Sequence, residues 1–403
     1  MPNLSETMPP EPNQGAVQVV TRPTAPVVAL PHIAAVDGLR AAACLAVVSF
    51  HCFYYGGRSE WPRFALGRHE FLPSHVLLYG HLGVELFFVL SGFCLAYPFF
   101  RHPERSYDWK RYFVNRARRI YPPYWGALLL LSALAVVISH THVPALVESR
   151  VLELPPFRRL CLSFINPETD MNGSFWTLKV ELRWYLLLPL LLLLLHRRVK
   201  SPGLMGIAVL VSVIYALAAK PGTPATNLIS TLPLYLPLFV AGIWIAEMAA
   251  VGRPTRLELA LIRYARWGAV FSCVIIWLVT PPMPTNDIRY DRVVPGGLLA
   301  SFLLLLTLYD PALRRVLSWR PLVSIGLFSY SLYLIHQPIV EIVYAVVGPR
   351  GWPAYAEILF FQGAVPTGCV ALGYLFYRVA EKPFLRRPPQ RDHAGGTPQA
   401  RKV

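Results

Sequence analysis

Ten long apolar segments, separated by short charged stretches, dominate the pattern of hydrophobic and polar positions along the chain. A helix needs about 20 apolar residues to cross the roughly 30 Å hydrocarbon core of a bilayer. Most of the segments approach that length, so the pattern predicts an all-α, polytopic membrane protein, a bundle of about ten transmembrane helices. The predicted spans are 33–55, 80–100, 120–139, 178–195, 204–219, 228–248, 265–280, 294–309, 322–347 and 356–379.

The two ends of the chain depart from this pattern. Residues 1–30 are rich in Pro and polar residues and lack the apolar core of a signal peptide, and 388–403 are again polar. We therefore expect a flexible tail at 1–30, one transmembrane domain at 31–387 and a second flexible tail at 388–403.

Composition supports the membrane class and changes how the charge is interpreted. The chain is 55% hydrophobic and 15% charged, with a net charge of +16. One alternating set of loops carries 16 Lys and Arg residues and the other carries 10, spread over longer loops. The positive-inside rule then makes the first set cytoplasmic, with both termini inside, in the cytoplasmic (inner) membrane. The basic charge is therefore explained by topology and contact with membrane lipid, and no nucleic-acid partner is expected.

Arg40 and His51 lie on the first predicted span, eleven residues apart. Eleven helical residues make three turns plus about 20°, so both side chains face the same way, about 16 Å apart along the axis. Ionisable groups inside a bilayer are costly and usually functional. The loop charges place Arg40 toward the cytoplasm and His51 toward the outer face, where a neutral imidazole can deprotonate a hydroxyl. The alternative for His51 is a structural hydrogen bond.

Glu85 opens the second span, which runs inward, so it too is expected near the outer face. A carboxylate at that depth can orient His51 and stabilise its imidazolium. The alternatives are a carboxylate at the water interface or one paired with Arg183. We keep Glu85, with His51 and Arg40, among the candidate catalytic residues.

A basic cluster of Arg116, Arg118 and Arg119 ends the inner loop before the third span. Guanidinium groups suit phosphate and pyrophosphate, so an anionic cosubstrate entering from the cytosol would meet these residues first. Basic clusters beside spans also fix topology or contact anionic lipid, and taken alone the cluster favours that interpretation.

Four further residues are candidates for binding the second substrate. Glu181 and Tyr185 are four residues apart on the fourth span and share a face, and with Trp176 they are expected to line an acceptor pocket. An ordinary aromatic belt is the alternative for Trp176 and Tyr185. His336 falls within the ninth span, where it either joins helices by a hydrogen bond or lines the cavity.

The sequence lacks the motifs of several classes of enzyme and of metal sites. Ser91 lacks the G-x-S-x-G elbow of serine hydrolases, and there is no P-loop, G-x-G-x-x-G or H-E-x-x-H sequence. His32 and Asp37 spell H-x4-D, a pattern of glycerolipid acyltransferases that is expected by chance about one time in five with this His and Asp content. The His residues have no metal-ligand spacing, so no metal is expected. Six cysteines without a C-x-x-C pair predict free, buried thiols.

Six ordered blocks resemble the acyltransferase-3 family of integral membrane acyltransferases, from about residue 33 to 387. The blocks are Arg40-x10-His51, 83–93, 116–125, 176–178 with Glu181 and Tyr185, 329–338, and 381–384. The resemblance implies a ten-span helical bundle that moves acyl groups, often acetyl, from acyl-CoA to hydroxyls of surface sugars, lipids or glycosylated metabolites. It also implies that Arg40 and His51 are the essential pair. Glu85 stands where the family usually has Asp, and we expect no fused SGNH hydrolase-like domain of the kind that some members carry.

These features predict a mechanism. The phosphates of acyl-CoA, with acetyl-CoA favoured, bind Arg116, Arg118 and Arg119, and the pantetheine arm passes Arg40. His51, oriented by Glu85, acts as general base on a hydroxyl of a carbohydrate or glycosylated acceptor, for which we favour a polysaccharide over a macrolide-type molecule. Alternatively His51 carries the acyl group covalently, or Arg40 stabilises the oxyanion. Two other classes remain open: a transporter or flippase, and an acyltransferase acting on cytosolic lipid.

Overall fold

The computed structural model describes residues 34–55, 64–66, 69–71, 73–102, 107–141, 154–167, 171–197, 200–218, 232–279, 290–348 and 352–385. Both predicted tails lie outside these ranges. Apart from a short hairpin of β1 (Phe64–Leu66) and β2 (His69–Phe71), the described residues are helical. The main helices are α1 (Ala34–Tyr55), α2 (Gly83–Arg101), α3 (Trp109–Ser139), α6 (Trp176–Arg197), α7 (Ser201–Ala218), α8 (Leu232–Val251), α10 (Ala265–Val279), α11 (Tyr290–Tyr309), α14 (Ser329–Val347) and α16 (Val365–Phe376).

Shorter elements connect and extend these helices. They are the 3-10 helices η1 (Pro73–Leu82), η2 (Gly173–Phe175) and η5 (Lys382–Phe384), the helices α5 (Phe157–Ser163), α9 (Arg256–Arg263), α12 (Pro311–Leu317), α13 (Arg320–Leu327) and α15 (Ala354–Leu359), and the π-helical turns η3 (Phe360–Ala364) and η4 (Tyr377–Glu381). The π turns interrupt the last predicted span, 356–379, without ending it.

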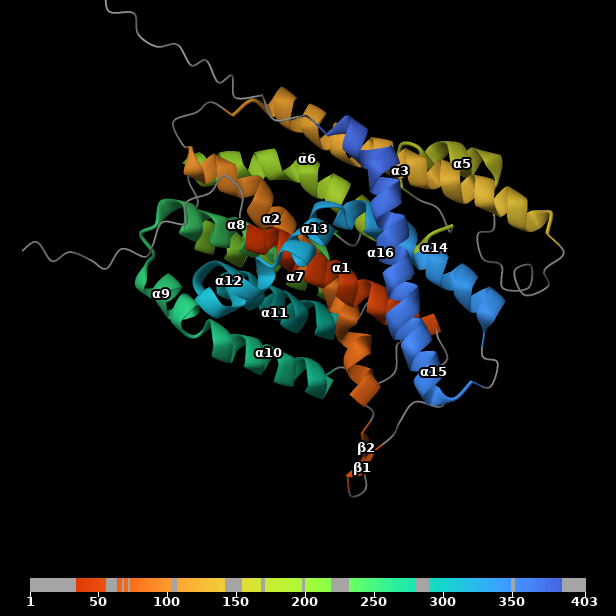
Figure 1. Cartoon of the computed structure of the whole chain (residues 1–403). Coiled ribbons are helices and arrows are strands. Elements are labelled where there is room, and N and C mark those ends of the chain that lie inside the picture. The colour runs from red at the N-terminus through yellow and green to blue at the C-terminus, as the bar shows by residue number, and fades with distance from the viewer. Residues whose placement is uncertain are drawn as a thin grey trace, which may run out of the picture.

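The first helix, α1, lies in the middle of the bundle (Figure 1). It packs against α2, α11, α12, α13, α14 and α16, so its residues can contribute to sites on several sides. Asp37, Gly38 and Leu39 are buried even at its beginning. A helix that is buried on most of its circumference needs few polar residues, and those it carries must find partners inside the protein.

The structure is that of an all-α polytopic membrane protein. Seven helices of the described residues are long and apolar enough to cross a membrane, and nine are if each of two bent pairs forms one span. The bent pairs are α9 with α10, at 66°, and residues 293–309 with α12, at 95°. The remaining predicted span, 178–195, coincides with α6, a 22-residue helix whose first turns carry Lys179, Glu181 and Arg183.

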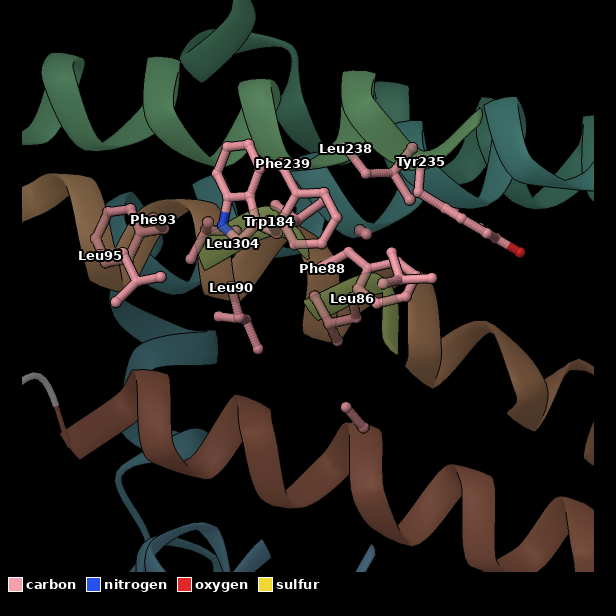
Figure 2. Close-up of a cluster of buried hydrophobic side chains, with 14 of the residues drawn as sticks. Leu86, Phe88, Leu90, Phe93, Leu95, Trp184, Tyr235, Leu238, Phe239 and Leu304 are labelled. Atoms are coloured by element: carbon pink, nitrogen blue, oxygen red, sulfur yellow. The ribbon is translucent and has the colours of Figure 1, made fainter. Parts of the chain in front are cut away.

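The most extensive helix pair is α2 with α8, and its backbones approach closely. A Cβ added to Gly92 of α2 would lie 2.0 Å from the carbonyl oxygen of Phe239, and one added to Gly242 of α8 would lie 2.1 Å from that of Val89. Glycine at both crossing points therefore permits the contact, as small residues do between membrane helices. Aromatic side chains fill the space beside it, where the rings of Trp184 and Phe239 stack 4.3 Å apart (Figure 2).

The third helix begins earlier than the apolar pattern predicts. The predicted span is 120–139, but α3 starts at Trp109, so the basic cluster lies on a helix and not in a loop. The side chain of Asp108 caps this end by accepting a hydrogen bond from the backbone N–H of Arg111 at 2.9 Å. Arg and Lys are good helix formers, which allows the charged turns to continue into the apolar ones.

All six cysteines are free. Cys44, Cys52 and Cys369 are buried, whereas Cys161 and Cys273 are exposed on the surface of the helices. The prediction of free thiols is confirmed, but the expectation that they are buried holds for only three of the six.

Candidate active site

A cavity of about 230 Å³ lies between α1, α2, α3, α6 and α14. Its polar lining consists of Arg40, Ser91, Cys94, Arg116, Arg119, Thr177, Glu181, Tyr185, Ser329, Tyr330 and Tyr333. Three guanidinium groups therefore face one carboxylate, that of Glu181. We call this space the guanidinium cavity. Behind this lining, Asp37 forms an ion pair with Arg40, and Glu381 interacts electrostatically with Arg40 and Arg119. The lining itself is positively charged and suits an anionic occupant.

Arg40 is held at the cavity by two neighbours. Its Nη1 donates to Oδ1 of Asp37 at 3.0 Å, and its Nη2 lies 3.5 Å from Sγ of Cys94 on α2. Arg40 lines the cavity while it keeps both of these contacts. Arg40 thus lies near the beginning of α1 and lines the same cavity as Arg116 and Arg119.

Of the three arginines in the basic cluster, only Arg116 and Arg119 line the cavity. They are three residues apart on α3 and share a face. Arg118 lies on the opposite side of the helix and is exposed. Nε of Arg116 is buried and has no hydrogen-bond partner among the described residues, so this donor is available to a ligand. The structure therefore brings Arg116 and Arg119 together with Arg40 and separates Arg118 from them.

Glu181 and Tyr185 share a face of α6, as predicted, but this face belongs to the guanidinium cavity. The hydroxyl of Tyr185 donates to Oε1 of Glu181, and the hydroxyl of Ser91 lies 3.4 Å from the same oxygen. The two residues accordingly lie with the arginines near the beginning of α1, and not beside His51, where the acceptor pocket was expected.

His51 contacts a second imidazole. Its Nδ1 lies 3.0 Å from the carbonyl oxygen of Val47 and 3.2 Å from Nε2 of His336 on α14. Nδ1 of His336 in turn lies 2.8 Å from the carbonyl oxygen of Tyr333. His336 is fully buried, whereas His51 is half-buried. We call His51 and His336 the imidazole pair.

Pro338 shapes the turn of α14 that carries His336. Because proline has no N–H, the carbonyl of Leu334 lacks its helical donor. The side chain of Asn172 supplies one, at 2.7 Å from Nδ2 to that oxygen. The segment before α6 is thereby fixed to α14 next to the imidazole pair.

A chain of polar groups continues from the imidazole pair toward the end of α1. The ring of Tyr55 is stacked on that of His51, with centroids 6.3 Å apart, and its hydroxyl donates to Oε1 of Glu341 at 2.6 Å. Gln337 donates to the same oxygen at 2.8 Å and accepts from the hydroxyl of Ser174 at 2.6 Å. These groups could present hydrogen-bond partners to a polar molecule that reaches His51.

Tyr333 lies between the guanidinium cavity and the imidazole pair. It lines the cavity, and its ring centroid is 5.3 Å from that of His336. Its hydroxyl accepts from Thr177 at 3.1 Å, and the ring of Phe87 packs against it edge-on at 5.7 Å. His51 itself is not part of the cavity lining, so Tyr333 is the boundary between the two regions.

Glu85 is not hydrogen-bonded to His51. It is buried at the start of α2, with its side chain facing Gly296 of α11, where a Cβ would lie 3.3 Å from its Cγ. Oε2 of Glu85 has no hydrogen-bond partner among the described residues. Within the same residues, Glu85 forms no ion pair with Arg183. The contact expected from the sequence is made instead by His336.

Trp176 contributes to the core. Its ring packs against Tyr235 at 5.7 Å and Phe88 at 6.3 Å, and it does not line the cavity. Within the described residues, no group of three His, Cys, Asp or Glu side chains is arranged to hold a metal ion.

Sequence reasoning did not find the pairing of His336 with His51, nor Tyr55, Tyr333, Gln337 and Glu341. One signal was present: Tyr330, Tyr333 and Gln337 follow helical spacing along one face of the ninth span, next to His336. His51, however, which His336 contacts, is 285 residues away along the chain.

A scan against family models matches residues 33–378 to the model described as an acyltransferase domain, that of the acyltransferase-3 family. Among curated proteins, the chain is 25% identical to the peptidoglycan O-acetyltransferase OatA of Listeria monocytogenes over 81% of this chain and 53% of the relative. It is 27% identical to the acyltransferase MdmB of Streptomyces mycarofaciens, over 89% of this chain and 92% of the relative.

A third relative is the exopolysaccharide production protein ExoZ of Rhizobium meliloti, 27% identical over 78% of this chain and 92% of the relative. The chain spans about half the length of OatA and of the putative peptidoglycan O-acetyltransferase YrhL of Bacillus subtilis. No solved structure matches the chain.

Proposed function

This chain belongs to the acyltransferase-3 family, and from that premise we propose that it is a membrane-embedded O-acyltransferase that esterifies a hydroxyl of a cell-surface carbohydrate. The donor is a cytosolic acyl-CoA, acetyl-CoA in the first place. The names of relatives such as OatA and ExoZ support a glycan acceptor, while MdmB is named only as an acyltransferase. The observation that carries the proposal is the placement of a guanidinium cavity and an imidazole pair at the two ends of α1.

The guanidinium cavity is suited to the donor. Arg116 and Arg119 present fork-shaped donors for the phosphates of CoA, and the unpartnered Nε of Arg116 supports an anionic ligand. Arg40 lies on the way along α1 and contacts the arm. In this arrangement the basic turns of α3 face the cytosol, in keeping with the excess of positive charge on that set of loops, and both termini are cytoplasmic.

The imidazole pair is suited to the acceptor. His51 lies about 16 Å along α1 from Arg40, close to the end of the helix and to the hydrogen-bonding groups of Tyr55, Gln337 and Glu341. Nε2 of His51 has no hydrogen-bond partner among the described residues, so it can accept a proton from a hydroxyl.

The reaction is a direct transfer. Nε2 of His51 takes the proton of the acceptor hydroxyl while its oxygen attacks the thioester carbonyl carbon. The carbon–sulfur bond then breaks, and the CoA thiolate leaves and takes the proton from the imidazolium. Because Tyr333 separates the cavity from His51, the thioester reaches the imidazole only when the Tyr333 ring is displaced. No protein–acyl intermediate is needed in this scheme.

Mass spectrometry of envelope glycans tests the proposal. Cells that lack the gene, complemented with wild type or with His51→Ala, are compared for ester groups. We expect esters to be lost on deletion, restored by wild type and not restored by H51A at equal membrane levels. Purified protein should also transfer label from [14C]acetyl-CoA to the identified glycan. Unchanged esters on deletion, together with no binding of CoA, would contradict the proposal and favour a transporter.

A further inference from the structure

The hydrogen bonds of the imidazole pair indicate which ring nitrogens carry the protons. Each ring has one nitrogen next to a backbone carbonyl, which accepts hydrogen bonds and donates none. Nδ1 of His51 lies 3.0 Å from the oxygen of Val47, and Nδ1 of His336 lies 2.8 Å from the oxygen of Tyr333. Both contacts require a proton on Nδ1, so in the neutral rings both Nε2 atoms carry a lone pair.

The contact between the rings agrees with this assignment. Nε2 of His336, an acceptor, faces Nδ1 of His51, a donor, at 3.2 Å. The opposite tautomers would place either two lone pairs or two protons against each other, or a lone pair against a carbonyl. One arrangement alone therefore satisfies all three contacts.

The carbonyl of Val47 and Nε2 of His336 share the proton on Nδ1 of His51. As residue i−4 of a continuous helix, Val47 already accepts the backbone N–H of His51. Nε2 of His336 accepts no other hydrogen bond among the described residues. The fully buried ring is held by the hydrogen bond from its Nδ1 to the carbonyl oxygen of Tyr333. His336 therefore adds to the carbonyl of Val47 a second acceptor for Nδ1–H of His51.

We infer that His336 is a positioning residue that fixes His51 in the Nδ1–H tautomer, so that Nε2 is the basic nitrogen. The catalytic part of this inference rests on the proposed function. In catalytic triads a third group orients the base in this manner, and here a neutral imidazole takes that place. As His51 gains a proton on Nε2, its Nδ1–H becomes a stronger donor, and the hydrogen bond to His336 strengthens with it.

A matched pair of substitutions separates the hydrogen bond from the volume of the side chain. His336→Gln keeps an acceptor oxygen at about the reach of Nε2, and His336→Met has a similar length without a strong acceptor. We expect H336M to lower kcat by about 100-fold, within the range of general acid–base catalysis, with KM for acyl-CoA unchanged. H336Q should recover kcat to within about tenfold of wild type. Equal losses in both variants, or a kcat of H336M near that of wild type, would overturn the inference.

Nitrogen NMR of histidine gives a readout that does not depend on activity. In protein labelled with 15N-histidine and reconstituted in nanodiscs, the His51 signals are assigned by their loss in His51→Gln. We expect protonated Nδ1 and unprotonated Nε2 in wild type and a mixture of tautomers in H336M. An unchanged His51 spectrum in H336M would overturn the inference. If wild type showed this tautomer but transferred no acyl group, the proposed function would fail while the positioning role stood.

Discussion

The guanidinium cavity and the imidazole pair use polar groups in opposite ways. In the cavity, three arginines meet one glutamate, and a buried nitrogen of Arg116 lacks a partner. In the imidazole pair, Nδ1 of His51 and both ring nitrogens of His336 each lie within 3.2 Å of a hydrogen-bond partner. The first region thus contains a buried donor without a partner, whereas the contacts between the two rings are satisfied. We expect this difference if, as proposed, one region binds the donor substrate and the other is organised in advance to react.

The largest expected effect is at the imidazole pair. His51→Gln removes the base but keeps a side chain of similar reach, and it should lower kcat about 10²- to 10⁴-fold, the contribution of a general base. Affinity for acyl-CoA should be unchanged, because His51 does not line the cavity. Single-turnover kinetics and equilibrium binding of a non-hydrolysable CoA analogue measure the two quantities. A parallel loss of CoA affinity would mean that the two regions are not distinct.

The second effect belongs to the guanidinium cavity. Removing Arg116 and Arg119 together by substitution with Ala should weaken binding of acyl-CoA at least 10-fold, since hydrogen bonds to charged groups contribute about 1.5–3 kcal/mol each. The value of kcat at saturating donor should change little. Arg118→Ala is the matched control, because Arg118 is on the same helix but is exposed. If R118A weakened binding as much as the double variant, general surface charge and not the cavity would attract the donor.

The boundary between the regions gives a smaller and different effect. Tyr333→Ala removes the ring that lies between the cavity and His336. We expect hydrolysis of acyl-CoA without acceptor to rise several-fold, to about tenfold, as water gains access to the thioester. Tyr333→Phe keeps the ring and should hydrolyse at the wild-type rate. Thiol release measured with and without acceptor tests this, and no difference between the Ala and Phe variants would show that Tyr333 does not close the cavity.

The smallest effect is expected at Glu85. Since no hydrogen bond joins it to His51, Glu85→Gln should change kcat by less than about tenfold, or 1.4 kcal/mol. The melting temperature should rise, because a buried carboxylate with an unpartnered oxygen is replaced by a neutral group of the same size. Assays of transfer and of thermal unfolding in detergent check both. A loss as large as that of His51→Gln would require a second conformation in which Glu85 reaches His51.

The apolar pattern predicted the membrane class and placed the helices well. The cores of α1, α2, α8 and α10 follow from long apolar runs. The start of α3 was not predicted by the apolar pattern, because its first turns are charged and amphipathic. Only the Asp108 cap and the helix-forming residues favour a helix there. The helix α6 was found by its leucines in spite of three charges in its first turns, although it is not among the helices apolar enough to count as a membrane span.

The candidate site could be predicted only in part. Helical spacing places Arg116 and Arg119 on one face and Arg118 on another, so the separation seen in the structure was available from the sequence. The facing of His51 and Arg40 along α1 could likewise be computed. The partner of His51 could not, since Glu85 and His336 are both polar residues on apolar spans. Which of them packs against α1 at that depth depends on how α2 and α14 lie in the bundle.

The glycine contact between α2 and α8 also bears on the shape of the guanidinium cavity. Gly92 lies next to Ser91 and two residues before Cys94, both of which line the guanidinium cavity. A methyl group at position 92 would have to move about 1 Å or more away from the backbone of α8 to reach ordinary van der Waals distance. One wall of the guanidinium cavity is therefore positioned by the contact of α2 with α8, and a single methyl group at position 92 would move that wall.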